Sequence, residues 1–134
     1  MCRYSEEIKQ TIWEDALVVD GYDQTKYRKD PCGAWIIRDK YGLKDSQYGW
    51  EIDHIIPQSL LEKAGVPIEV IDNVLNLRAM NWKNNESKSD DYPVYHACFS
   101  SEGNTNIIKE EDFEVAEDKQ EELKKLFQGY DLSL

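Results

Sequence analysis

The first apolar positions of the chain have the spacing of an amphipathic helix. Hydrophobic residues recur at intervals of three and four from Ile8 to Leu17. Ser5 stands just before two acids, which is typical of a capped helix start. We therefore expect a helix within residues 1–20 that ends before Gly21.

The middle of the chain changes to the alternation that is typical of strands. Residues 34–39, AWIIRD, predict a short strand, and residues 50–56, WEIDHII, predict a second one that Pro57 ends. A further strand is predicted from Val74 to about Arg78, and a short polar helix from about Met80 to Lys88. The order there is strand, long loop, strand, helix.

The remaining segments are less regular. Residues 21–33 are polar and rich in turn-forming residues, so we expect a loop there. Residues 92–99, YPVYHACF, predict a strand or an apolar docking segment. An acidic helix is expected from Glu110 to Phe127. A chain of 134 residues with this mixture is expected to form one α+β domain over residues 1–134.

The charge is unusual for a protein that binds nucleic acid. The formal net charge is −11, and residues 91–134 hold eleven acids against four bases. No apolar run approaches the roughly 18 to 20 residues that cross a bilayer, and no apolar stretch follows the N-terminus as in a signal peptide. We expect a cytoplasmic protein with no membrane partner.

The cysteines indicate neither a disulfide framework nor a structural zinc site. Cys2, Cys32 and Cys98 are odd in number, far apart and never in a C-x-x-C arrangement. We expect three free thiols, with Cys2 exposed and Cys32 in the core.

Candidate chemistry gathers in the strand, loop, strand, helix unit. Asp53 and His54 are neighbours in the first strand, and Asn76 and Asn85 follow in the second strand and the helix. Histidine can accept a proton near neutral pH, and Asp and Asn oxygens favour Mg²⁺ or Mn²⁺ over zinc. Taken singly, an Asp-His pair on a strand is more often structural, and an Asn-rich helix usually just faces water.

The order of these residues resembles the HNH endonuclease family, whose core is a ββα-metal motif. The matching text is WEIDHIIPQS followed by NLRAMNWKNNESKSD, with Asn76 and Asn85 nine positions apart. The local likeness extends to the HNH domain of RNA-guided CRISPR nucleases. The resemblance covers about residues 28–93. It implies an HNH core there and leaves both ends of the chain unexplained. The expected fold is this core with an N-terminal helix in residues 1–20, an extra short hairpin and, in the extension 94–134, an acidic C-terminal helix.

The resemblance also implies roles. His54 would be the general base that activates water, and Asn76 would orient His54 through a loop or backbone hydrogen bond. Asp53 and Asn85 would bind one divalent metal ion, Mg²⁺ or alternatively Mn²⁺, and DNA would be cut to leave a 5′-phosphate and a 3′-hydroxyl. One objection comes from strand geometry, since Asp53 and His54 point to opposite faces unless the strand is distorted or ends there.

Contacts to DNA phosphates are expected from six basic residues: Arg28, Lys29, Arg38, Arg78, Lys83 and Lys88. For Lys88, a helix-terminal cation is an equally good interpretation. The acidic C-terminal helix is interpreted as a solvated face, a screen against nonspecific DNA binding, or a contact for a basic protein partner. Two other functions stay open: an inactive HNH-fold module that binds nucleic acid or a partner, and an acidic DNA-mimic inhibitor.

Overall fold

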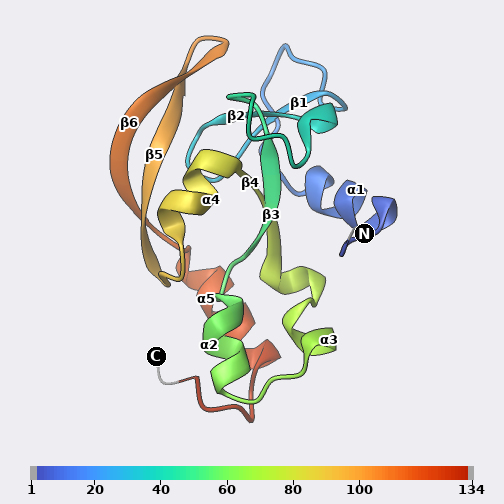
Figure 1. The fold of residues 1–134 in the computed structure, drawn as a ribbon, viewed down its shortest axis with the longest axis vertical. Coiled ribbons are helices and arrows are strands. Elements are labelled where there is room, and N and C mark those ends of the chain that lie inside the picture. Colours follow the sequence, from blue (N-terminus) through green and yellow to red (C-terminus); the bar gives the residue numbers. More distant parts are fainter. Residues whose placement is uncertain (1–2, 133–134) are drawn as a thin grey trace.

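The structure is a computed structural model that describes residues 3–132, and it is a mixed α+β fold (Figure 1). Its elements, in chain order, are α1 (Glu6–Glu14), β1 (Tyr27–Lys29), β2 (Trp35–Ile37), a 3₁₀ turn (Arg38–Lys40), β3 (Trp50–His54), α2 (Gln58–Lys63), α3 (Ile68–Ile71), a 3₁₀ turn (Val74–Asn76), β4 (Leu77–Asn81), α4 (Trp82–Lys88), β5 (Val94–Glu102), β6 (Thr105–Glu114) and α5 (Glu117–Leu126). The strands form three separate antiparallel pairs: β1 with β2, β3 with β4, and β5 with β6.

The first helix is shorter than the hydrophobic spacing predicts. Ser5 caps α1 as expected, because its Oγ accepts a hydrogen bond from the Ile8 amide at 3.1 Å. The helix ends at Glu14, well before Gly21, because the chain turns and Leu17 pairs with Lys29 through two backbone hydrogen bonds. The apolar positions after Glu14 therefore serve this pairing and do not extend the helix.

The segment expected to be a loop contains the strand β1. Tyr27 pairs with Ile37 and Lys29 pairs with Trp35, so β1 and β2 form a short hairpin. Its turn is held by the buried carboxylate of Asp30, whose Oδ1 accepts hydrogen bonds from the turn amides. The pattern missed β1 because three residues are too few to show an alternation.

The hairpin β3–β4 lies between α1 and α4 (Figure 1). Because side chains alternate along a strand, Trp50 and Ile52 face one way and pack with Ile12 and Trp13 of α1. The intervening residues of β3 face α4. The strand ends at His54, two residues earlier than expected. β4 begins at Leu77 because the preceding residues form a 3₁₀ turn.

The predicted helix from Glu110 to Phe127 is wrong in its first half. Residues 105–114 form β6, which pairs with β5 in a long hairpin, and α5 starts only at Glu117. Local acidic spacing favoured a helix, but β6 completes the backbone hydrogen bonds of β5. Phe113 also stacks on Tyr95, with ring centroids 6.1 Å apart. The strand expected within residues 92–99 is present as part of β5.

A second core extends from β4 and β5 to α2, α3 and α5, the three helices at the lower end of the molecule (Figure 1). Cys32 is buried as expected, and Cys32 and Cys98 are free thiols. The expectation for Cys2 falls outside the described residues. Within residues 3–132, no helix combines the length and the apolar character that crossing a bilayer requires.

Candidate functional site

His54 is held by a carboxylate that the sequence pattern did not single out. Its Nε2 lies 2.8 Å from Asp72 Oδ1 and 3.3 Å from the Tyr4 hydroxyl. Arg3 binds the same carboxylate, with Nη2 2.7 Å from Oδ1. Burial opposes ionisation of Asp72, but the hydrogen bonds from Arg3 and His54 outweigh it, so the pKa of Asp72 lies below its usual value. Asp72 therefore fixes the orientation of the imidazole.

Asn76 braces the chain immediately after His54. Its side chain is fully buried, accepts a hydrogen bond from the Ile56 amide at 2.9 Å, and donates to the Ile56 carbonyl at 3.2 Å. The Ile55 amide donates to the Asn76 carbonyl at 2.8 Å. The side chain thus replaces the strand pairing that β3 loses at its end, and it sets the path of the backbone that carries His54.

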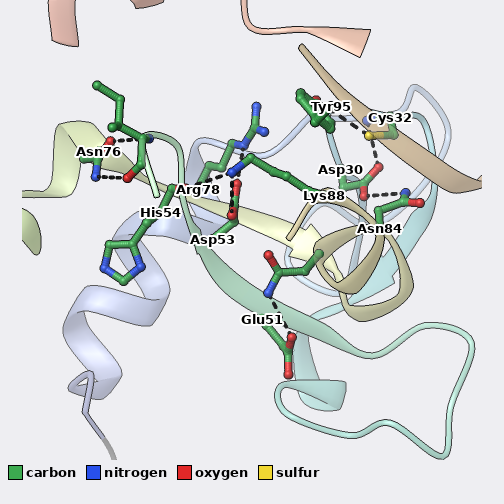
Figure 2. Close-up of polar contacts among 12 residues, drawn as sticks. Asp30, Cys32, Glu51, Asp53, His54, Asn76, Arg78, Asn84, Lys88 and Tyr95 are labelled. Carbon is green, nitrogen blue, oxygen red and sulfur yellow. Dashed lines mark hydrogen bonds and ion pairs between the residues drawn. The ribbon is translucent and has the colours of Figure 1, made fainter. Parts of the chain in front are cut away.

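Asp53 points away from His54 (Figure 2). Its Oδ2 lies 3.0 Å from Arg78 Nε, and its Oδ1 lies 3.3 Å from Lys88 Nζ. Lys88 is fully buried and also donates to the His54 carbonyl at 3.1 Å. Burial lowers the pKa of Lys88, although Asp53 opposes that change. The strand does not distort enough to bring the Asp53 and His54 side chains together, so the geometric objection holds in this structure.

The other predicted metal ligand, Asn85, contacts a different acid. Its Nδ2 donates to Glu51 Oε1 at 3.0 Å. Glu51 precedes Asp53 by two positions, so both side chains lie on the face of β3 from which they contact α4, Glu51 through Asn85 and Asp53 through Lys88. Glu51 was not among the predicted ligands, because nothing in its sequence context separates it from an ordinary surface acid.

The donor atoms of this site suit a divalent metal ion, but the charge of its main carboxylate is already neutralised. Carboxylate and amide oxygens are the donors that Mg²⁺ prefers, and Glu51, Asp53 and Asn85 supply them. Asp53 is already balanced by two cations, so a metal ion has to displace Lys88 from it. Within residues 3–132, no group of three or more His, Cys, Asp and Glu side chains is arranged to hold a metal ion.

The six basic residues expected to contact phosphates do not form one surface. Arg28 is buried, and its guanidinium donates to the carbonyls of Gln24, Glu14 and Ala16, so this arrangement does not support a phosphate contact. The positions of the other five are as follows: Arg78 and Lys88 are bound to Asp53, Arg38 contacts Gln10 and Glu6, Lys29 lies over Trp35, and Lys83 lies over Trp82. Lys88 does stand in the last turn of α4, but its ammonium is buried and bound to Asp53 and to the His54 carbonyl.

The second histidine contacts two acids of β6. His96 is on β5, where its two ring nitrogens contact Asp112 at 3.0 Å and Glu110 at 3.2 Å. The hydrogen bond to Asp112 and, to a smaller extent, the one to Glu110 raise the pKa of His96. It is an exposed histidine within an acidic hairpin, and it stays outside the site as expected.

Comparison of the chain with models of known protein families, with curated proteins and with solved structures gave no match. Its function is therefore inferred from its own residues and their contacts.

Proposed function

We propose that this protein is a metal-dependent endonuclease of the HNH type that hydrolyses DNA phosphodiester bonds. The observation that carries the proposal is His54 at the end of β3, with Nε2 held by Asp72 at 2.8 Å. The surrounding order of β3, β4 and α4 agrees with the ββα arrangement that the sequence resemblance implies.

In this proposal His54 takes a proton from the attacking water. A base that is oriented by a third group is the usual arrangement for this step. Because Asp72 contacts Nε2, the other ring nitrogen, Nδ1, is the one left to face the water; it has no hydrogen-bond partner within residues 3–132. Asn76 serves as a positioning residue, since it fixes the backbone that follows His54.

In this proposal the metal ion would be held by Glu51, Asp53 and Asn85. When bound, a divalent cation supplies Lewis-acid stabilisation of the charge that develops on the phosphate. Glu51 holds Asn85 close to β3 through its hydrogen bond. Without a metal ion, Lys88 neutralises Asp53. The choice of Mg²⁺ over Mn²⁺ remains a prediction from the oxygen donors.

A second function is favoured by one specific observation. Asp53 is neutralised by two cations, and Nη2 of Arg78 is a buried nitrogen with no hydrogen-bond partner among the described residues. Because two cations already neutralise Asp53, this carboxylate does not need a metal ion for charge balance. That arrangement favours an HNH-fold module that binds nucleic acid or a partner without cutting.

The test is nicking of supercoiled plasmid with Mg²⁺ or Mn²⁺, with EDTA as the metal control. We expect nicks bearing a 5′-phosphate and a 3′-hydroxyl, and we expect His54→Ala to abolish them. His96→Ala is the matched control, because it removes the one other histidine from a site elsewhere on the surface. Absence of nicking with either metal, or equal nicking by His54→Ala, would leave the binding module as the better proposal.

The metal site has its own test. Asn85→Ala is expected to raise the Mg²⁺ concentration needed for half-maximal nicking while the circular dichroism spectrum stays unchanged. Glu51→Gln is expected to act in the same direction, because it weakens the same group of oxygens. Unchanged metal dependence in both variants would remove this group as the metal site.

A further inference from the structure

The hairpin β1–β2 carries two aromatic side chains on one face: Tyr27 is 38% exposed, whereas Trp35 is only 4% exposed. Tyr27 lies opposite Ile37, and Lys29 lies opposite Trp35. Because side chains alternate along a strand, these four share one face, while Ile36 between them is fully buried on the other. Aromatic side chains on an exposed sheet face are the platform on which several nucleic-acid-binding domains stack bases.

Three further segments turn this face into a hollow of about 340 Å³. Its lining consists of Tyr22, Tyr27, Trp35, Ile37, Tyr48 and Asn104. The Tyr22 ring lies 4.7 Å from Trp35 at 53° and 6.5 Å from Tyr27 at 79°. Tyr22 therefore packs directly on Trp35, and the three tilted rings together line the hollow.

The charges in and beside the hollow indicate which kind of ligand it suits. None of its six lining residues is charged, although the whole chain carries −11. Lys29 Nζ lies 4.8 Å from the centroid of the Trp35 ring. An ammonium already on this ring disfavours a cationic ligand, and it favours a ligand that carries an aromatic ring beside a negative group. A nucleobase with its phosphate has this combination.

The rim of the hollow supplies a hydrogen-bonding group. Asn104 comes from the turn between β5 and β6, and its backbone carbonyl accepts a hydrogen bond from the Tyr48 hydroxyl at 3.3 Å. Its side-chain amide has no hydrogen-bond partner within residues 3–132. An amide has both a donor and an acceptor, which suits it to the edge of an unpaired base.

We propose that this hollow binds one unstacked base of single-stranded DNA, with Lys29 beside the adjoining phosphate. The inference rests on the proposed function, because it names the form of the DNA that the nuclease takes. Bases in a duplex are stacked and paired, so they enter such a hollow only at the cost of unstacking. The hollow therefore favours single-stranded DNA over duplex.

The test is the equilibrium binding of a fluorescent oligothymidylate, followed by anisotropy in EDTA so that no cleavage occurs. Tyr27→Ala is expected to weaken binding roughly 5- to 150-fold, the effect of losing one stacking partner. Tyr27→Phe is the matched control and is expected to bind like the wild type, because it keeps the ring. If Tyr27→Ala does not fold, Tyr22→Ala replaces it, since Tyr22 is 42% exposed.

Salt dependence separates the phosphate contact from the base contact. Lys29→Gln is expected to reduce the slope of log affinity against log salt by about 0.7, whereas Tyr27→Ala is expected to leave the slope unchanged. A duplex of the same length is expected to bind more weakly than the single strand. Free thymidine is expected to compete only at far higher concentration, and competition at equal strength would overturn the assignment to a polynucleotide.

The outcomes distinguish this inference from the nuclease proposal. Equal binding by the wild type and Tyr27→Ala overturns the base subsite even if the plasmid is nicked. Loss of binding in Tyr27→Ala, with retention in Tyr27→Phe, supports the subsite even if no nicking is found.

Discussion

Asp30 is a fully buried carboxylate whose replacement by asparagine tests how the β1–β2 turn is attached to α4. Its Oδ1 accepts from the amides of Cys32 and Ala34, both at 2.9 Å. Its Oδ2 accepts from the Asn81 amide at 3.1 Å and from Asn84 Nδ2 at 3.0 Å. One side chain therefore satisfies the turn and the start of α4 together (Figure 2).

The expected loss of stability follows from the number of buried hydrogen-bond donors that lose their acceptor. An asparagine can keep the two turn contacts with its oxygen, but its amide nitrogen then faces the donors of Asn81 and Asn84. Each buried donor left without an acceptor costs about 1–3 kcal/mol. Burial raises the pKa of Asp30, so removing the charge relieves part of the desolvation cost. We expect Asp30→Asn to lower the free energy of unfolding by about 2–4 kcal/mol.

The assay is urea denaturation followed by tryptophan fluorescence. Asp20→Asn is the matched control, because Asp20 is exposed, and it is expected to change the free energy of unfolding by less than about 0.5 kcal/mol. A loss below about 1 kcal/mol for Asp30→Asn would refute the reasoning, since it would mean that the Asn81 and Asn84 donors find other acceptors at little cost.

The remaining predictions concern His54 and its supports. Asp72→Asn is expected to slow plasmid nicking at least about tenfold with the fold intact; a wild-type rate would remove the orienting role. Asn76→Ala is expected to lower the free energy of unfolding in urea by about 2–4 kcal/mol, because buried groups of Ile56 lose their partner, and a neutral result would contradict that. Burial raises the pKa of Tyr4 to about 12, so the folded state holds this proton more tightly than the unfolded state. That contribution is complete below about pH 10 and is lost as the pH rises toward 12; the wild type should therefore lose up to about 2 kcal/mol more than Tyr4→Phe over this range in denaturation experiments.

Local patterns predicted the elements whose residues carry their own signal. Ser5 at the start of α1 is one example, since a cap depends only on neighbours in the chain. The alternation from Trp50 to His54 is another, because one face of β3 is apolar. β6 was missed for the opposite reason: its acidic residues suit a helix locally, and only pairing with β5 makes it a strand.

In the candidate site, too, some residues could be predicted from the sequence and others only from the tertiary structure. The resemblance to the HNH pattern brought His54, Asn76 and Asn85 forward as a group, because residue order and spacing can be compared along the chain alone. The partner of His54 came from the fold, since Asp72 reaches it only through the path of α3, and no local pattern marks it. The partners of Asp53 were likewise decided in three dimensions: strand alternation turns it toward α4, where Lys88 and Arg78 neutralise it. Spacing along a chain determines which groups are available, whereas burial and direction determine which of them meet.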